Sequence, residues 1–263
     1  MSGFRVLAPG ILSLLQDNGR FGYSALGLTN GGPADAQSAF FANQLLHNDS
    51  NATLIECSIG GLTLQAQCHS YIAVTGATLA LGINGKNVEL WTVHKVQPGD
   101  TITLGVVSRG VRAYLAVAGG FAVPAQFGST ATVLREGIGG LNGTPLQQGD
   151  ILQAPTVSQL ARRQLPLRWR PGFNRTLTLR LVEGYQAARF STEQRQRFYM
   201  HSYTVTPQAD RMGYKLSGAA ITCAEQTLLS EGICYGAVQI PPDGQPIVLL
   251  NDRQTLGGYP KMG

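Results

Sequence analysis

Charged side chains that could bind anions or move protons are concentrated between residues 209 and 261. Two Asp-Arg pairs stand in this segment, together with Glu231 and Lys261. Arginine binds a carboxylate or phosphate through two parallel hydrogen bonds, and a carboxylate can accept a proton from a reacting group. Turns between strands use Gly, Pro, Asn or Asp and do not need these charged groups. The residues that we predict to be catalytic are Asp210, Arg211, Glu231, Asp252 and Arg253.

Glycine, glutamine and aromatic residues of the same segment would complete a pocket. They flank short apolar runs such as residues 247–250, so the ends of strands would bring them to one rim. Two successive glycines permit positive φ angles and close backbone approach. We therefore expect Gly257 and Gly258 to form a tight turn that brings Lys261 beside the loop at 210–213. The substrate-binding residues predicted here are Gln239, Gln245, Gly257, Gly258, Tyr259 and Lys261.

A structural role for the same charges is the alternative. Neighbouring residues in a strand point to opposite faces, so the aspartate and arginine of each pair would have different partners. Each of these residues could then form an ion pair that stabilises the fold and takes no part in chemistry.

A second polar cluster lies near the N-terminus. We expect it to contribute to substrate binding through Gln16, Asp17, Arg20 and Asp35. Here too a structural alternative stays open, because Asp17 and Arg20 could pair across a turn and Asp35 could cap a helix.

Composition favours a mainly β protein. Charged residues make up 13% of the 263 residues, about half the usual share, and 33 residues are glycine. A hydrophobic content of 43% and a modest net charge of +5 argue against disorder. We predict β-barrels with a few short helices and two subdomains, residues 1–160 and 161–263.

Local patterns locate several elements. Asn84-Gly85 favours a type I′ turn and predicts a hairpin of residues 79–83 and 86–90. Alternating apolar residues predict further strands at 72–75, 101–104 and 176–181. Helices are expected at 36–46, after Asp35, and from a capping box at Ser191 to Met200.

Other classes of partner find little support in the sequence. No aromatic stacking motif accompanies the cluster Arg162, Arg163, Arg168, Arg170 and Arg175, so a nucleic-acid partner is not expected. No run approaches the ~20 apolar residues of a membrane span. The 4 cysteines and 4 histidines lack metal-ligand spacing, and we predict no metal site. We expect reduced, buried, structural cysteines and a cytoplasmic protein.

Short motifs along nearly the whole chain resemble those of one family. They include Gln16-Asp17, Gly19-Arg20-Phe21-Gly22-Tyr23, Gly32-Pro33-Ala34-Asp35, Asp210-Arg211-Met212-Gly213-Tyr214, Ser230-Glu231-Gly232, Asp243-Gly244-Gln245-Pro246 and Asp252-Arg253-Gln254. On these motifs the sequence resembles the allophanate hydrolase subunit 2 family, which is also called the KipA-like family and includes the 5-oxoprolinase C subunit. The carboxyltransferase domain of urea carboxylase is related to it.

The chain departs from the family pattern in places. The family has an arginine in the loop where this chain reads Gly128-Ser129-Thr130-Ala131-Thr132, which puts an anion contact from that loop in doubt. Ala209 and Leu256 replace a usual serine and threonine. Family members continue beyond the position of Gly263, so we expect a truncated or divergent form.

The resemblance implies a cyclophilin-like β-barrel fold and one component of an ATP-dependent 5-oxoprolinase, which converts 5-oxoproline to glutamate. The implied partners are a KipI-like protein and a LamB/YcsF-like protein, with ATP as co-substrate of the complex. Two alternatives remain: a carboxyltransferase component that acts on biotin carried by another protein, and a regulatory partner of a KipI-like kinase inhibitor.

Overall fold

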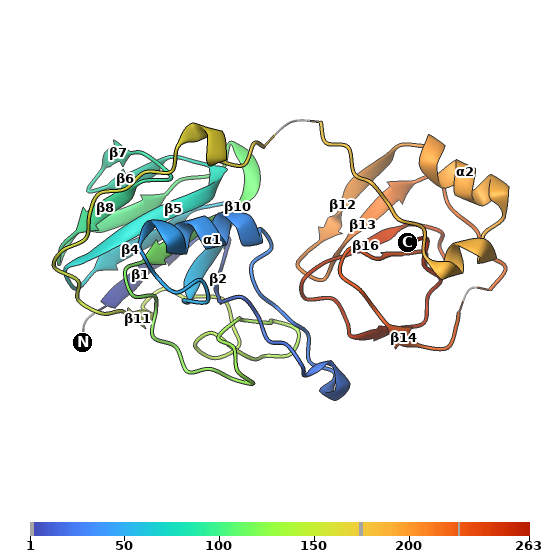
Figure 1. Ribbon diagram of the computed structural model, residues 1–263, viewed down its shortest axis with the longest axis horizontal. Helices are drawn as coiled ribbons and strands as arrows, with labels where there is room; N and C mark the ends of the chain where they lie inside the picture. Colours follow the sequence, from blue (N-terminus) through green and yellow to red (C-terminus); the bar gives the residue numbers. More distant parts are fainter. Residues whose placement is uncertain (1–2, 174–175, 226) are drawn as a thin grey trace. The chain divides into compact units, whose positions relative to one another are not determined.

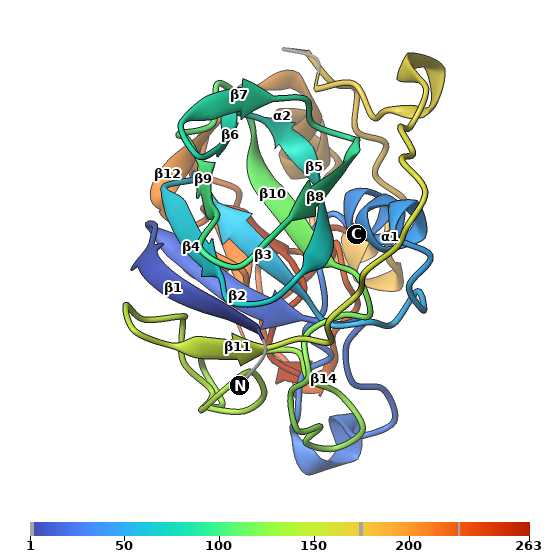
Figure 2. The ribbon, with the colours of Figure 1, turned by 90° about the vertical axis from the view of Figure 1, so that its left-hand side faces the viewer.

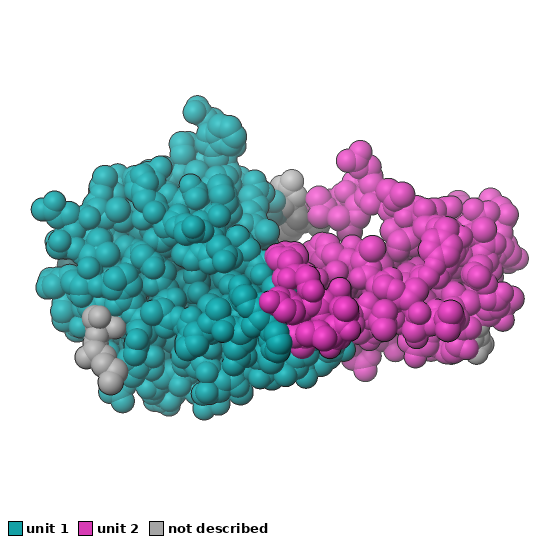
Figure 3. Space-filling model, turned by 60° about the horizontal axis from the view of Figure 1, so that its bottom comes forward, with its two compact units in different colours: residues 1–20, 31–175 teal, residues 21–30, 176–263 magenta. Residues whose placement is uncertain are grey.

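The computed structural model describes residues 3–173, 176–225 and 227–263 (Figure 1), so Arg175 of the arginine cluster lies outside the described residues. The chain forms two compact units (Figure 3). Unit 1 comprises residues 1–20 and 31–175, and unit 2 comprises residues 21–30 and 176–263. The division thus falls fifteen residues after the boundary that we drew at 160, and the segment 21–30 belongs to unit 2 although it lies early in the sequence.

Unit 1 consists of two antiparallel sheets and one helix (Figures 1 and 2). The first sheet has the order β11 (Ile151–Gln153), β1 (Gly3–Pro9), β4 (Leu62–Ala66), β9 (Thr101–Leu104), β6 (Leu81–Ile83) and β7 (Lys86–Val88). The second has the order β2 (Leu12–Gln16), β3 (Leu54–Ser58), β10 (Arg109–Val117), β5 (Ser70–Thr78) and β8 (Val93–Val96). The helix is α1 (Ala36–Leu45), and the short 3-10 helix η2 (Leu167–Trp169) follows the last strand.

The main core of unit 1 lies between the two sheets. Fully buried residues such as Phe4 and Leu64 of the first sheet belong to one cluster with Ile55 and Leu115 of the second. Helix α1 covers the opposite face of the second sheet, where Ala42 is buried in a cluster with small residues of β5 and β10. The small alanine side chains let the helix backbone approach the sheet closely, and this contact holds the segment that precedes the helix.

Unit 2 is built on a smaller antiparallel sheet. Its order is β12 (Tyr203–Ala209), β13 (Gly213–Gly218), β16 (Ile247–Leu249) and β15 (Val238–Gln239). A two-stranded ladder pairs β14 (Glu231–Gly232) with β17 (Leu256–Gly257). The helical elements are η1 (Ser24–Leu26), η3 (Tyr185–Arg189) and α2 (Thr192–Met200). Phe190 and Met262 are buried in the core of this unit.

Most local predictions are confirmed. The turn at Asn84-Gly85 has positive φ at both residues and joins β6 to β7. Asp35 caps α1 by accepting a hydrogen bond from the backbone N–H of Ser38, and Ser191 caps α2 in the same way. The mainly β class is confirmed as well, although the sheets stay open among the described residues and do not close into a barrel.

One predicted strand is wrong. Residues 176–181 form no strand, despite their alternating pattern. Leu177 and Leu179 are largely exposed, at 74% and 81%. The alternation is typical of a strand with one buried face, but in the described part of unit 2 no neighbouring strand pairs with this segment.

Candidate functional site

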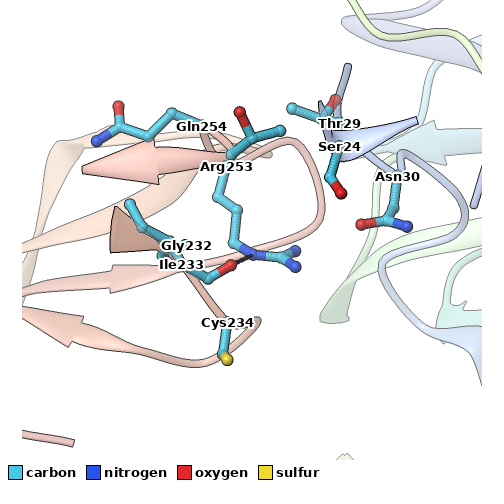
Figure 4. A pocket seen from close by; sticks show the side chains of 9 residues that line it. Ser24, Thr29, Asn30, Gly232, Ile233, Cys234, Arg253 and Gln254 are labelled. Atoms are coloured by element: carbon cyan, nitrogen blue, oxygen red, sulfur yellow. Dashed lines mark hydrogen bonds between the residues drawn. The ribbon is translucent and has the colours of Figure 1, made fainter. Parts of the chain in front are cut away.

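A pocket in unit 2 surrounds the side chain of Arg253 (Figure 4). Its volume is about 360 Å³. The residues that line it come from three stretches of the unit: Ser24, Thr29, Asn30, Gly232, Ile233, Cys234, Arg253, Gln254 and Thr255. Gly232 pairs with Leu256 in the β14–β17 ladder, and this pairing brings the second and third of these stretches together. Figure 4 shows the guanidinium near the middle of the group, with the Asn30 side chain turned towards it and Gln254 turned away.

Two backbone carbonyls hold Arg253 in place. Its Nε donates to the carbonyl oxygen of Ile233 at 3.0 Å, and its Nη1 donates to that of Leu250 at 3.2 Å. The guanidinium carbon also lies 6.0 Å from the centre of the Tyr235 ring. These contacts position the group without neutralising it. Among the residues that the structure describes, no carboxylate lies within 4.0 Å of this guanidinium.

The electrostatics of Arg253 follow from this arrangement. Partial burial lowers the pKa of its guanidinium, and the neighbouring Cys234 and Tyr235 oppose that effect. Arginine nevertheless stays protonated in proteins. A half-buried cation without a carboxylate partner is suited to binding an anion that enters the pocket.

Glu231 and Lys261 form a second polar centre in unit 2. The Nζ atom of Lys261 lies 2.6 Å from Oε1 of Glu231, and Nε2 of Gln186 donates to the same oxygen at 2.7 Å. The hydroxyl of Tyr185 donates to the other carboxylate oxygen. The glutamate side chain retains 32% exposure, so its carboxylate is held by three donors and is still reachable by solvent. Because Glu231 precedes Gly232 in β14, this centre adjoins the strand that lines the pocket.

The Glu231–Lys261 contact differs from the position that we expected for Lys261. The backbone of Lys261 pairs with Gln239 of β15, and its N–H donates to Oε1 of Gln186 at 2.9 Å. Within the described ranges, its hydrogen-bonding partners do not include the loop at 210–213.

Arg211 and Asp252 form a buried ion pair. The Nε and Nη2 atoms of Arg211 donate to the two carboxylate oxygens of Asp252 at 2.8 and 2.9 Å. The two side chains are 4% and 5% exposed. This geometry is the structural alternative that we set out for these charges. A catalytic role for either residue stays a prediction.

The remaining predicted residues of unit 2 have varied surroundings. Asp210 is exposed, and its Oδ1 accepts hydrogen bonds from the backbone of Met212 and Gly213, so it shapes its own turn. The amide of Gln245 accepts a hydrogen bond from the N–H of Gly218 and donates one to its carbonyl oxygen. Gln239 is buried at 2% exposure, whereas Tyr259 is 37% exposed.

The expected turn at Gly257 and Gly258 is wrong. Gly257 belongs to β17, and neither glycine has a positive φ. The expected close approach is nevertheless present. A Cβ atom at Gly257 would lie 2.4 Å from Cδ1 of Ile233 and 2.7 Å from Nε2 of Gln239, and one at Gly258 would lie 2.7 Å from the carbonyl oxygen of Leu228. Glycine is therefore used here for space and not for its left-handed conformation.

The predicted residues of unit 1 make contacts that fix loops. Gln16 accepts from Gly32 N–H and donates to the carbonyl of Thr132. Arg20 donates to the carbonyl of Ala131 at 2.7 Å. Asp17 accepts from three groups, which are Gly19 N–H, the Ser129 hydroxyl and Thr130 N–H. With Asp35 as a helix cap, all four predicted residues of this unit have structural contacts, and substrate binding by them stays a prediction.

A buried network around Glu56 also belongs to unit 1. The fully buried carboxylate accepts from the Tyr114 hydroxyl and the Ala34 N–H, both at 2.8 Å, and from Nε of Arg112 at 3.2 Å. The Tyr114 oxygen in turn accepts from Asp35 N–H at 2.7 Å. Burial, reinforced by the charge of Glu56, raises the pKa of Tyr114 well above its usual value. The network fixes the start of α1.

Sequence reasoning missed several residues of the unit 2 site. Tyr185 and Gln186 lie in η3, about 45 residues before Glu231, and no motif marked them. Cys234 was expected to be buried, but it is exposed and lines the pocket. Its position two residues after the Ser230-Glu231-Gly232 motif could have indicated that it lies at the site.

Two kinds of feature are absent from the described residues. They contain no cluster of three or more His, Cys, Asp or Glu side chains that could hold a metal ion. They also contain no helix that is long and apolar enough to cross a membrane.

Comparisons with known proteins identify the family. Residues 26–263 match the model of the carboxyltransferase domain, subdomain A and B. The chain belongs to this family.

Curated relatives include two bacterial proteins that are named as parts of one enzyme. The chain is 36% identical to the 5-oxoprolinase C subunit of Escherichia coli, over 98% of this chain and 83% of that protein. It is 34% identical to the protein of the same name in Haemophilus influenzae, over 94% and 79% of the two chains. It is also 27% identical to urea amidolyase of Saccharomyces cerevisiae, where it matches 15% of that much longer protein.

Solved structures agree with this assignment. The crystal structure of TTHA0988 superposes with a TM-score of 0.87 at 33% identity, over 99% of this chain and 51% of that one. The chain thus spans about half the length of that protein. The urea amidolyase of K. lactis gives a TM-score of 0.88 at 28% identity, over 99% of this chain and 17% of that one.

Proposed function

We propose that this chain is the C subunit of an ATP-dependent 5-oxoprolinase, a hydrolase complex that opens 5-oxoproline to glutamate. The observation that carries the proposal is the identity of 36% and 34% to two proteins of that name, over nearly the whole chain. A KipI-like protein and a LamB/YcsF-like protein are the proposed partners in the complex, and the cytoplasm is the proposed location.

The chemistry of the reaction suits the residues of unit 2. The lactam of 5-oxoproline is stabilised by resonance, so water attacks it slowly. Transfer of a phosphoryl group from ATP to the lactam oxygen would make the ring carbon more electrophilic. Water would add to that carbon with cleavage of the ring C–N bond, and a second water would release phosphate from the resulting acyl phosphate. The substrate carries a carboxylate throughout, and the activated form carries a phosphate as well. Both groups require cations, which bind them through charge-assisted hydrogen bonds.

Arg253 is our candidate for the anion contact. Its backbone hydrogen bonds orient the guanidinium, and its lack of a carboxylate partner in the described structure leaves the charge available. Glu231 is the candidate for a proton acceptor, because its carboxylate is partly exposed and fixed in orientation. The proposal includes ATP as co-substrate of the complex and does not assign the nucleotide site to this chain.

A carboxyltransferase function is the second candidate. The family model itself is that of a carboxyltransferase domain, and urea amidolyases match nearly the whole chain. A carboxyl group carried on biotin would also require a cation and a base. Biotin would then come from another protein, as a cofactor of this alternative only.

Assembly and ligand binding test the proposal before turnover is measured. A tagged chain should co-purify with a KipI-like protein. In that complex, iodoacetamide should alkylate Cys234, because this thiol is exposed and lines the Arg253 pocket. We expect 5-oxoproline to slow this alkylation and urea to leave it unchanged. Protection by urea alone would favour the carboxyltransferase, and 5-oxoproline that protects neither the complex nor the free chain would contradict the proposal.

A further inference from the structure

Gln186 occupies the centre of the Glu231–Lys261 contact. It lies in η3 and is 4% exposed. Its amide nitrogen donates to Oε1 of Glu231 at 2.7 Å and lies 3.1 Å from the Tyr185 oxygen. Its amide oxygen accepts from the N–H of Lys261 at 2.9 Å. A single buried side chain therefore joins three segments that are far apart in the sequence.

The two ends of the Gln186 amide bind different groups. The oxygen fixes the backbone of Lys261, which determines where the lysine side chain starts. The nitrogen fixes the carboxylate oxygen that the Lys261 ammonium also contacts at 2.6 Å. Both charged groups are thus located by the same planar amide. Loss of this amide would leave the direct contact between Glu231 and Lys261 without the group that locates both residues.

Two other glutamines among the described residues bind different kinds of group. Gln16 and Gln245 use both ends of their amides as well, but each binds backbone groups only. Gln186 binds an ionised side chain that retains access to solvent. Hydrogen bonds to charged groups are stronger than those between neutral groups, so this one has more influence on orientation.

We propose that Gln186 is a positioning residue that sets the geometry of Glu231 and Lys261 for proton transfer in unit 2. It acts through these two residues and need not touch substrate. The inference rests on the proposed role of Glu231, but its consequence for Lys261 can be measured without turnover.

Selective acetylation of lysine gives the first readout. The chain has few lysines, and Lys215, which pairs with Asp243 on the surface, is an internal reference in unit 2. In the wild-type chain we expect Lys261 to react more slowly than Lys215 with an acetylating reagent, as followed by peptide mass spectrometry. Gln186→Ala should raise the ratio of the Lys261 rate to the Lys215 rate about tenfold, because the ammonium loses its fixed partner.

Gln194→Ala on α2 is the matched control, because it also removes a glutamine amide contact in unit 2, to the backbone N–H of Thr222, but leaves Glu231 and Lys261 untouched. It should leave that ratio unchanged. A Gln186→Ala ratio equal to that of wild type, at an unchanged melting temperature, would overturn the proposal. If the variant unfolds, Gln186→Met replaces it, since this change keeps the length of the side chain and removes both hydrogen-bonding ends of the amide without adding a charge.

Kinetics of the assembled complex give the second readout. Gln186→Ala should lower kcat at least about tenfold with little change in KM, whereas Gln194→Ala should retain kcat. Equal kcat values for the two variants would contradict a positioning role. A wild-type complex without 5-oxoprolinase activity would refute the proposed function instead, and the acetylation ratio would then decide the role of Gln186.

Discussion

The ammonium of Lys261 lies 2.6 Å from a carboxylate oxygen of Glu231, a residue 30 positions earlier in the chain. The first strand of the β14–β17 ladder carries the glutamate, and the segment after the second strand carries the lysine. The chain that follows Glu231 leaves the strand after Gly232 and continues through Cys234, and these residues line the Arg253 pocket. The guanidinium of Arg253, which has no carboxylate partner among the described residues, is therefore bound to the chain two residues after the held carboxylate, at the carbonyl of Ile233. On this relationship we base the account of function.

Replacement of Arg253 tests the anion site. Arg253→Ala should reduce turnover of the complex at least ~10-fold, because a charge-assisted hydrogen bond contributes roughly 1.5–3 kcal/mol. Arg253→Lys should recover part of the loss, since it keeps the charge but not the two-pronged contact. Thermal unfolding serves as the control. If Arg253→Ala loses stability and activity together, the residue acts in structure.

Replacement of Arg211 tests the opposite role. Arg211→Ala leaves the buried Asp252 carboxylate without its bidentate partner, which typically costs about 3–5 kcal/mol. We expect urea unfolding to show a loss of that order. The matched control is Arg197→Ala on α2, whose loss should stay below about 0.5 kcal/mol. An Arg211→Ala chain of normal stability but no activity would support catalysis by this residue.

The close packing at Gly257 gives a third prediction. Gly257→Ala should displace the ends of Ile233 and Gln239 and cost about 1–3 kcal/mol, as overpacking does. Gly232→Ala in the neighbouring strand is a stringent control, since a Cβ there would have nothing within 4 Å. Differential scanning calorimetry should separate the two variants. Equal melting temperatures would show that the space at Gly257 is not needed.

The raised pKa of Tyr114 predicts how the free energy of unfolding changes at alkaline pH. Its pKa is raised in the folded chain, so the stability gained from the neutral phenol is fully present below its unfolded pKa of about 10 and is lost as pH rises above it. Between pH 10 and 11 the free energy of unfolding should fall by up to about 1.4 kcal/mol more for wild type than for Tyr114→Phe. The other tyrosines are common to both chains and cancel. Parallel pH profiles would contradict the pKa direction.

Local rules predicted the elements whose causes lie within a few residues. Asn84-Gly85 required a tight turn, and the side chains of Asp35 and Ser191 supplied helix caps. The strand expected at 176–181 failed because alternation shows only that one face is apolar. It cannot show whether a partner strand is present.

The candidate site could be predicted only in part, because some of its contacts join segments that are far apart in the sequence. Residue type identified Arg253 and Glu231, and the structure brings both to the same ladder region. Contacts between distant segments were beyond local reasoning. The pairing of Arg211 with Asp252 spans 41 residues, and that of Gln186 with Glu231 spans 45. Nothing in the sequence near η3 indicates that Gln186 faces a carboxylate.

Phosphate release that depends on 5-oxoproline tests the central claim most directly. The chain should be combined with a KipI-like protein and a LamB/YcsF-like protein, and each component should be omitted in turn. We predict that 5-oxoproline stimulates ATP hydrolysis and yields glutamate only when all three are present. No stimulation by 5-oxoproline in the full mixture, together with ATP-dependent carboxylation of urea when a biotin carboxylase is supplied, would contradict the account.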